Sequence, residues 1–257
     1  MSKLIALAGK GGTGKTTIAS AIIRMLLYEA SSLLAIDADP NNNLYEHLGL
    51  KKPETIMDMV EDISKGKISI PGGMTKDRFI NMKIQEVVME ADKFDLLSMG
   101  RPEGPGCYCY ANNLLRDLIE KMEKNYNTIV IDNEAGMEHL SRRLTKKIDY
   151  LFIVSDFSII GIRSAKSISD LVGALDLKVG ESFLILNKAA GDIKDLEDEI
   201  NRTKIKFAGS MPYDKNLEAL SVRGGSIFEL EKDSPVLKSI DKIMQIFVFT
   251  ESIHKNK

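Results

Sequence analysis

The sequence predicts an α/β fold in which a mostly parallel sheet is covered by helices on both faces. Three observations lead to this prediction. Short apolar runs of β character alternate with segments whose apolar residues recur at helical intervals. The first short run leads directly into a glycine-rich loop and then into such a helix. The chain has 257 residues, 44% of them hydrophobic, which is enough to bury a sizeable core.

The alternation sets the order of the expected elements. Strands are expected at Leu4–Leu7, Leu33–Ile36, Thr128–Ile131, Leu151–Val154, Phe183–Leu186 and Phe207–Met211. Helices are expected at Thr17–Tyr28, Leu114–Met122, Ser164–Leu175, Ile193–Ile200 and Val236–Phe249. Strands joined through helices pair in parallel, with helices on both faces of the sheet.

The stretch from Lys51 to Glu90 interrupts this alternation. It contains Pro53, Pro71 and the pair Gly72 and Gly73, and we interpret it as a helical and loop excursion. The chain has no internal repeat, low-complexity tract or long polar linker that would divide it. We therefore expect a single domain over residues 1–257.

Charge and hydropathy restrict the partners of the protein. The chain has 35 Lys and Arg against 37 Asp and Glu, so no overall field attracts nucleic acid or an acidic membrane. The apolar run in Met1–Ala8 is too short for a signal peptide, and no later run approaches a membrane span. We expect a cytoplasmic protein that binds neither nucleic acid nor membrane.

The loop from Gly9 to Thr17 reads Gly-Lys-Gly-Gly-Thr-Gly-Lys-Thr-Thr and satisfies the P-loop pattern G-x-x-x-x-G-K-[ST]. Glycines let main-chain N–H groups turn inward around phosphate, and the helix that follows adds its dipole. An ordinary glycine turn is the alternative, but the strand before the loop and the helix after it favour a nucleotide site. The expected nucleotide-binding residues of the loop are Gly9, Gly11, Gly12, Thr13, Gly14, Lys15, Thr16 and Thr17.

The P-loop pattern also predicts roles for individual side chains. Lys15 is expected to reach the β- and γ-phosphates, and the Thr16 hydroxyl is expected to ligate Mg²⁺. Thr17 is expected to reach an α-phosphate oxygen. We therefore predict the fold of P-loop NTPases, a three-layer sandwich, with ATP or ADP and Mg²⁺ as cofactors and ATP hydrolysis as the reaction.

Lys10, directly after the first glycine, makes the loop a "deviant" Walker motif. This loop resembles the family that includes MinD, ParA, the arsenite pump ATPase and the nitrogenase iron protein. The resemblance implies a catalytic role for Lys10 across a homodimer interface, at the phosphates of the partner subunit. A solvent-exposed lysine without such a role is the alternative.

Two further segments match this family. Ala35–Asn41, which includes Asp39 and Pro40, resembles its first switch, and Asp39 is our candidate for positioning the attacking water. The alternative for Asp39 is a helix cap or a turn aspartate before proline. The segment Ile131–Gly136 resembles the second switch, and Asp132 is expected to face Mg²⁺ as a Walker B aspartate does.

Two segments late in the chain are expected to contact the base. Asn187 ends a predicted strand and could pair with a purine edge. Guanine-specific P-loop proteins have Asn-Lys-x-Asp here, but Ala190 occupies the position of the carboxylate, which favours adenine. The segment with Met211, Pro212 and Tyr213 resembles the adenine-lining segment of the family, although such a turn also occurs for purely structural reasons.

Cys107 and Cys109 are the only cysteines of the chain and are separated by one residue. We expect them in an extended segment just before a helix, where residues i and i+2 face the same side and two thiolates could hold one soft metal ion. A closed thiolate site needs four ligands, which a twofold dimer would supply. Two unbound thiols in a tight loop are the alternative.

Together, the deviant P-loop, Asp39-Pro40, the Cys-x-Cys pair and the segment Asp132–Arg143 resemble the CooC-type nickel-insertion accessory ATPases of carbon monoxide dehydrogenase. The resemblance implies a maturation factor that dimerises with ATP, binds nickel or zinc at the dimer interface through Cys107 and Cys109, and serves carbon monoxide dehydrogenase or acetyl-CoA synthase.

Two other classes of protein remain as alternatives. An ATP-dependent iron–sulfur reductase would bridge its dimer with a cluster, but that family separates its two cysteines widely. A positioning ATPase of the MinD or ParA type would use its C-terminal helix on a membrane or a basic face on DNA. Lys238 and Lys242 in the last predicted helix are interleaved with Asp241, which favours core packing over a membrane face.

Overall fold

A computed structural model describes residues 2–101, 107–135, 148–175 and 177–245. The strands are β1 (Lys3–Gly9), β2 (Leu33–Ala38), β3 (Met89–Glu90), β4 (Asp95–Ser98), β5 (Thr128–Asn133), β6 (Ile148–Asp156), β7 (Val179–Ala189) and β8 (Lys206–Pro212). They form one sheet in the order β3-β4-β2-β5-β1-β6-β7-β8. Every neighbouring pair is parallel except β3 and β4 at one edge.

Helices connect these strands and cover the sheet. The α-helices are α1 (Lys15–Leu26), α2 (Leu44–His47), α3 (Ile56–Ser64), α4 (Lys76–Lys83), α5 (Cys107–Met122), α7 (Ile159–Ala174), α8 (Glu197–Thr203), α9 (Lys215–Val222) and α10 (Pro235–Met244). Three 3₁₀ turns complete the described part: η1 (Ile84–Val87), η2 (Ile193–Leu196) and η3 (Ile227–Glu229).

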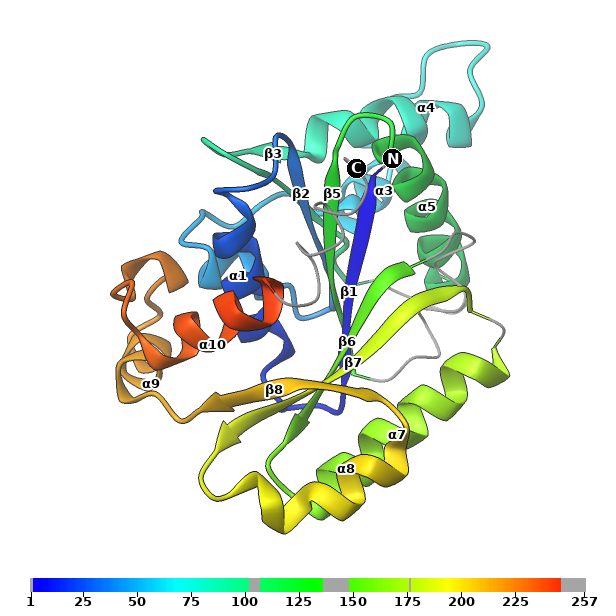
Figure 1. Ribbon diagram of the computed structural model, residues 1–257. Helices are drawn as coiled ribbons and strands as arrows, with labels where there is room; N and C mark the ends of the chain where they lie inside the picture. The colour runs from blue at the N-terminus through cyan, green and yellow to red at the C-terminus, as the bar shows by residue number, and fades with distance from the viewer. Residues whose placement is uncertain (1, 102–106, 136–147, 176, 246–257) are drawn as a thin grey trace, which may run out of the picture.

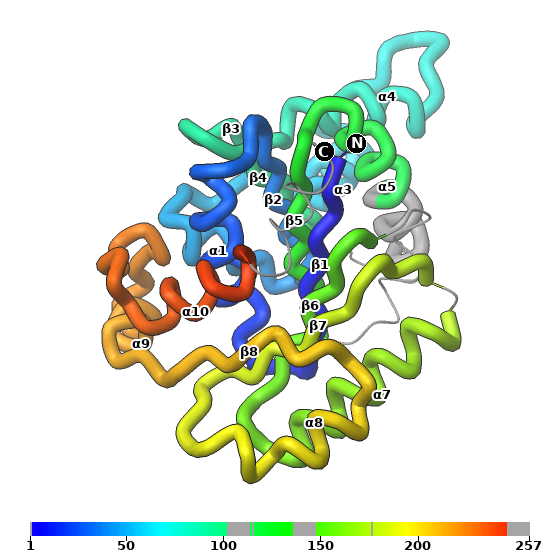
Figure 2. Tube along the Cα trace, viewed as in Figure 1, coloured from blue at the N-terminus to red at the C-terminus, as the bar shows by residue number. Residues whose placement is uncertain are grey.

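The sheet separates two layers of helices. One cluster of buried side chains joins the sheet to α1, α9 and α10, and a second joins its other face to α3, α4, α5, α7 and α8. Figure 1 shows α1, α9 and α10 together on one side of the strands, and Figure 2 shows the same arrangement along the Cα trace. This is the predicted three-layer α/β sandwich of the P-loop NTPases.

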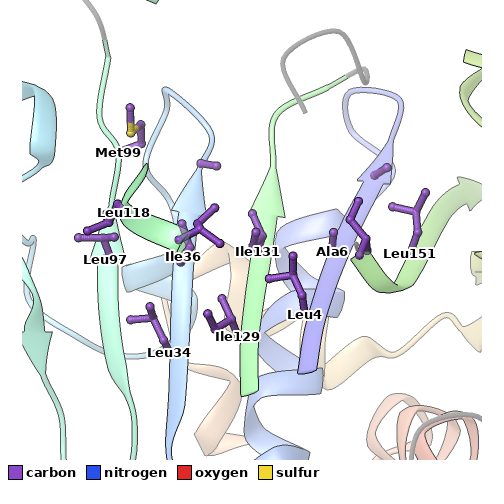
Figure 3. Packing of buried hydrophobic residues seen from close by; sticks show 14 of the residues in the cluster. Leu4, Ala6, Leu34, Ile36, Leu97, Met99, Leu118, Ile129, Ile131 and Leu151 are labelled. Atoms are coloured by element: carbon purple, nitrogen blue, oxygen red, sulfur yellow. The ribbon is translucent and has the colours of Figure 1, made fainter. Parts of the chain in front are cut away.

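The two faces of the sheet follow from the alternation of side chains along each strand. Leu4, Ala6, Leu34 and Ile36 lie on the face toward α5, where Leu118 packs against them. Figure 3 shows this row of aliphatic side chains across neighbouring strands. Residues in between point to the opposite face, toward α1. Both faces are therefore apolar, as expected of a parallel sheet covered on two sides.

The parallel strands direct their carboxyl ends to a common edge. The P-loop follows β1, which lies in the sheet between β5 and β6. From β1 the chain continues to β2 on one side, while β6, β7 and β8 extend the sheet on the other. Ligands of open α/β sheets bind outside the carboxyl ends of the strands where the chain switches sides in this way.

All six predicted strands are confirmed, as are the predicted helices between them, with ends that differ by several residues, except that the first half of the predicted helix Ile193–Ile200 is the 3₁₀ turn η2. The prediction missed β3, β4 and α9. Helix α7 begins five residues before the predicted start, at Ile159, where Ser158 caps it by accepting a hydrogen bond from the N–H of Gly161. Helix α10 ends at Met244, and the last part of the predicted helix Val236–Phe249 lies outside the described residues.

The excursion from Lys51 to Glu90 contains α3, α4, η1 and β3. Its apolar side chains, including Ile56 and Ile80, belong to the same buried cluster as Leu34 and Ile36 of the sheet. That the whole chain forms one domain stays a prediction. None of the helices in the described part combines the length and the apolar character needed to cross a bilayer.

Candidate functional site: a phosphate loop with a magnesium face

The P-loop turns sharply at two glycines. Gly9 has a φ of +154° and packs so closely against β6 that a Cβ atom there would lie 2.4 Å from the carbonyl oxygen of Val154. Gly14 has a φ of +90° and occupies the N-cap position of α1. L-residues with a side chain rarely adopt these values. Because Gly14 has no side chain with which to cap α1, the first turn of the helix presents its N–H groups to a phosphate.

Lys15 is the buried cation of this loop. It is 7% exposed, and its Nζ donates to the main-chain carbonyl of Lys10 over 3.3 Å. Burial lowers the pKa of Lys15, while the nearby carboxylates of Asp132, Asp39 and Glu134 act in the opposite direction. The ammonium group therefore lies near three carboxylates.

A cavity of about 630 Å³ opens in front of the P-loop, a size typical of sites for nucleotide-sized ligands. Its lining includes ten of the residues predicted from the sequence: Gly11, Gly12, Gly14, Lys15, Thr16, Thr17, Asp39, Asn187, Pro212 and Tyr213. The structure thus brings together residues from the P-loop, from the end of β2, and from the ends of β7 and β8.

Asp132 at the end of β5 has the properties expected of a magnesium-binding carboxylate. It is 1% exposed, and neither of its carboxyl oxygens has a hydrogen-bond partner of normal geometry among the described residues. Burial raises its pKa to about 7, while the Thr16 hydroxyl and the Lys15 ammonium act against this rise. A buried carboxylate beside a threonine hydroxyl is an oxygen donor set that fits Mg²⁺.

Asp37 is a second buried carboxylate on the neighbouring strand. Its Cα is the register partner of Asp132 across the β2–β5 pair. Burial, together with the charge of Asp132, raises the pKa of Asp37 to about 7, although hydrogen bonds from the N–H groups of Leu44 and Asp39 oppose this shift. Two carboxyl groups so close together do not both ionise readily without a cation.

Asp39 lies in the loop after β2 and lines the cavity. Its Oδ1 accepts a hydrogen bond from the N–H of Asn41 over 2.9 Å, which is an Asx turn. Helix α2 begins later, after Asn43, so Asp39 is not a helix cap. Asp39 thus makes the turn of the alternative interpretation and also faces the cavity, and its role in positioning water stays a prediction.

The end of the cavity expected to hold the base is lined by Asn187, Pro212 and Tyr213. Met211, which was expected beside them, is fully buried in the core between the sheet and α10 and does not line the cavity. It can therefore offer the base its main chain but not its side chain. Tyr213 is 46% exposed, and its hydroxyl donates to Glu218 of α9.

Several lining residues escaped the sequence analysis. Glu134 follows Asp132 in the second switch segment, and its charge acts on Lys15. His47 of α2 also lines the cavity, and burial lowers its pKa. The remaining residues of this group are Pro40, Asn41, Asn43, Ala135, Lys188, Asp214, Leu217, Glu218 and Ser221. The proximity of Glu134 to Asp132 in the sequence was a usable signal, whereas α9 was not predicted as a helix.

The prediction that Cys107 and Cys109 lie in an extended segment was wrong, because α5 begins at Cys107. Successive positions of an α-helix are rotated by about 100°, so the same-side argument for residues i and i+2 does not apply there. The side chains of residues 107–113 lie outside the described part, as does the segment 136–143. Among the described residues, no group of three or more His, Cys, Asp or Glu is placed to hold a metal ion.

The fold and the geometry of this site define a P-loop nucleotide-binding protein. The sequence profile of the CobQ/CobB/MinD/ParA nucleotide binding domain matches residues 4–227. The chain therefore belongs to this family of P-loop ATPases. This confirms the broader of the two resemblances, to the family of MinD and ParA.

Individual relatives cover nearly the whole chain. An uncharacterised ATP-binding protein of Methanocaldococcus jannaschii is 38% identical over 94% of this chain and 97% of its own length. The carbon monoxide dehydrogenase accessory protein CooC of Rhodospirillum rubrum is 30% identical over 88% of this chain and 89% of its own length. The MinD protein of Pyrococcus horikoshii, solved with Mg-ADP, covers 98% of both chains with a TM-score of 0.73 at 17% identity, which shows the fold alone.

Proposed function

We propose that this protein is a Mg²⁺-dependent ATPase that acts as a maturation factor for a nickel enzyme. The observation that carries the ATPase part is the buried Asp132, whose carboxyl oxygens have no hydrogen bond of normal geometry in the described part of the chain, beside Thr16 at the start of α1. Burying a carboxylate whose hydrogen bonds are incomplete is costly unless a cation satisfies it. A Mg²⁺ ion brought in with a nucleotide would do so.

Each residue of the site has a separate role in hydrolysis. Amides of the P-loop and the first turn of α1 bind the phosphates, and Lys15 exchanges the carbonyl of Lys10 for phosphate oxygens. Thr16 and Asp132 would hold Mg²⁺, which would supply positive charge against the charge that develops on the phosphates. Asp39 orients the attacking water in line with the γ-phosphate.

Dimerisation with ATP is the second part of the proposal. Lys10 is exposed, and its main-chain carbonyl accepts hydrogen bonds from the Thr13 hydroxyl (2.9 Å) and from Lys15 (3.3 Å). The loop is thus held by the main chain of Lys10, which leaves the side chain for the phosphates of a partner subunit. We expect Lys10→Ala to abolish ATP-dependent dimerisation in sedimentation velocity while the monomer still binds ADP. Full dimerisation of this variant would remove the role of Lys10 across the interface.

The cargo part of the proposal rests on Cys107 and Cys109 and on the resemblance to CooC. Helix α5 connects the parallel strands β4 and β5, so it runs against them and begins on the side of the sheet where the P-loop lies (Figure 1). On this proposal, a change of dimer geometry affects the nucleotide site and the cysteines in the first turn of α5 together. In a twofold dimer the two pairs supply four thiolates for Ni²⁺ or Zn²⁺.

The cysteine pair is tested by replacing both residues with serine. We expect the double variant to lose stoichiometric Ni²⁺ or Zn²⁺ binding in equilibrium dialysis, while ATP binding and hydrolysis are retained. Reconstitution of apo carbon monoxide dehydrogenase or apo acetyl-CoA synthase with nickel, ATP and the wild-type protein should then restore activity that the double variant does not restore. Unchanged metal binding by the double variant would overturn the cargo assignment.

A further inference from the structure

The loop that carries Asp39 is held at both ends by one carboxylate. Asp37, the fifth residue of β2, is fully buried. Its Oδ1 accepts a hydrogen bond from the N–H of Asp39 over 3.1 Å, and its Oδ2 accepts one from the N–H of Leu44 over 2.8 Å. Asp37 does not line the cavity. Its carboxylate therefore joins the beginning of the loop 39–44 to its end from outside the cavity lining.

The loop needs this support because its backbone is strained. Asn42 has a φ of +52°, a left-handed conformation that costs free energy in a residue other than glycine. Its N–H donates to the carbonyl of Asp39 over 3.0 Å. Its side-chain amide is buried, and neither polar atom has a hydrogen-bond partner in the described part of the chain. The side chain of Asn42 therefore does little to hold the loop.

The far end of the loop is anchored to the core. Leu44 begins α2 and is fully buried between the sheet and α1. Asn43, at the N-cap position of α2, makes no side-chain capping hydrogen bond. Asp37 provides this acceptor from seven residues earlier in the chain. The Asp37 carboxylate thus links the main chain of Asp39 to the main chain of Leu44, whose position is fixed by the core.

We infer that Asp37 is a positioning residue, whose carboxylate holds Asp39 where it can orient the attacking water. The inference rests on the proposed ATPase function and adds to it a residue that does not touch the substrate. A purely structural role, in which Asp37 only completes α2, predicts a loss of stability without a selective loss of turnover. The two roles therefore differ in kinetics.

Asp37→Asn tests this inference with a side chain of the same shape. The amide keeps one acceptor oxygen, but its NH₂ group faces the second N–H donor, so one end of the loop is released. The substitution also removes a buried charge beside Asp132, so we expect the variant to fold. We expect kcat for ATP to fall by at least about tenfold, because a displaced catalytic group loses its alignment. The Kd for ATP should change by less than about twofold, because the P-loop is untouched.

Asp58→Asn is the matched control. Asp58 accepts a hydrogen bond from the N–H of Thr55 over 3.2 Å in the capping box of α3 and does not line the cavity. The control should keep wild-type kcat. Hydrogen exchange of the wild-type protein gives a second measurement that needs no variant, and the amides of Asp39 and Leu44 should exchange slowly.

Three results would overturn the positioning role: wild-type kcat in Asp37→Asn, a rise in Kd in parallel with the loss of kcat, or fast exchange of the Asp39 and Leu44 amides. Failure of the proposed function would look different. It would show as a wild-type protein without Mg²⁺-dependent hydrolysis, or as full hydrolysis by Asp39→Asn, and slow exchange of the two amides could accompany either result.

Discussion

The side-chain amide of Asn187 donates a hydrogen bond to the main-chain carbonyl of Thr13 over 2.8 Å, joining the end of β7 to a P-loop that lies 174 residues earlier. The carbonyl oxygen of the same side chain accepts a hydrogen bond from the N–H of Lys188 over 2.9 Å. Asn187 is 8% exposed. In this structure Asn187 therefore supports the phosphate loop with the same amide that was predicted to pair with a purine.

This relationship predicts that Asn187→Ala weakens binding of the phosphates themselves. Loss of the hydrogen bond leaves the Thr13 carbonyl unpaired, so we expect about 1–2 kcal/mol weaker binding of ATP, GTP and tripolyphosphate alike. Isothermal titration calorimetry with the three ligands measures this. If Asn187 acted only on the base, tripolyphosphate would bind the variant as tightly as it binds the wild-type protein.

Gly14→Ala should distort the P-loop, because the new side chain strains the backbone of residue 14 and collides with a neighbouring side chain. Gly14 has a φ of +90°, and a Cβ atom there would lie 2.3 Å from Nδ2 of Asn187. We expect the substitution to lower the free energy of unfolding by about 1–3 kcal/mol and to abolish detectable ATP binding.

Gly173→Ala in α7 is the matched control for this change. No heavy atom lies within 4 Å of the place that a Cβ atom of residue 173 would occupy. Inside a helix, alanine is more stable than glycine by about 0.5–1 kcal/mol. We expect equal or higher stability with unchanged ATP binding, measured by chemical denaturation and calorimetry. Equal behaviour of the two alanine variants would contradict the assigned role of Gly14.

The buried pair Asp37 and Asp132 predicts an unusual dependence of stability on pH. Both folded-state pKa values are raised from 3.8 to about 7. Between these values the folded chain holds protons that the unfolded chain has released, so stability is highest at the acidic end of this window and is lost as pH rises through about 7. We expect this rise in pH to lower the free energy of unfolding of the nucleotide-free protein by on the order of 3 kcal/mol across the window.

Magnesium and nucleotide should reverse this trend, because the ion binds the deprotonated carboxylate. We expect the stabilisation by Mg-ADP, measured as a shift in Tm, to grow between about pH 6 and pH 8. Asp132→Asn should flatten the pH dependence of the nucleotide-free protein and reduce the response to Mg²⁺. A nucleotide-free protein whose stability rises steadily from about pH 5 to pH 8 would contradict the raised pKa values.

Most of the sheet could be predicted from local patterns, because its strands carry continuous apolar runs between turn residues. Strand β4 (Asp95–Ser98) was missed because it is only four residues long and its two central leucines are no stronger a strand signal than a helix signal. The start of α5 is not predictable from the pattern, because the first turn of that helix lacks an apolar repeat and follows a segment of glycine and proline that favours extended structure.

The site was predictable where one segment provides the chemistry, as in the P-loop and the residues after β2 and β5. The role of Asp37 was not predictable, because its partner Leu44 becomes its neighbour only when the loop folds back. The contact between Asn187 and Thr13 depends on strand order, which no spacing in the sequence encodes. Met211 is predicted to contact the base from its segment alone, although its side chain is buried in the core at the end of β8.

The central proposal is an ATPase in which Asp39 orients water and Asp132 with Thr16 binds Mg²⁺. Asp39→Asn tests it most directly, because asparagine can still accept the hydrogen bond from the N–H of Asn41 and so preserves the loop. The measurement is single-turnover ATP hydrolysis with Mg²⁺ by the wild-type and the variant protein, together with the Kd for ATP. We predict hydrolysis by the wild-type protein, and for the variant a loss of at least about 100-fold with Kd unchanged. Hydrolysis at the wild-type rate by Asp39→Asn, or none by the wild-type protein, would contradict it.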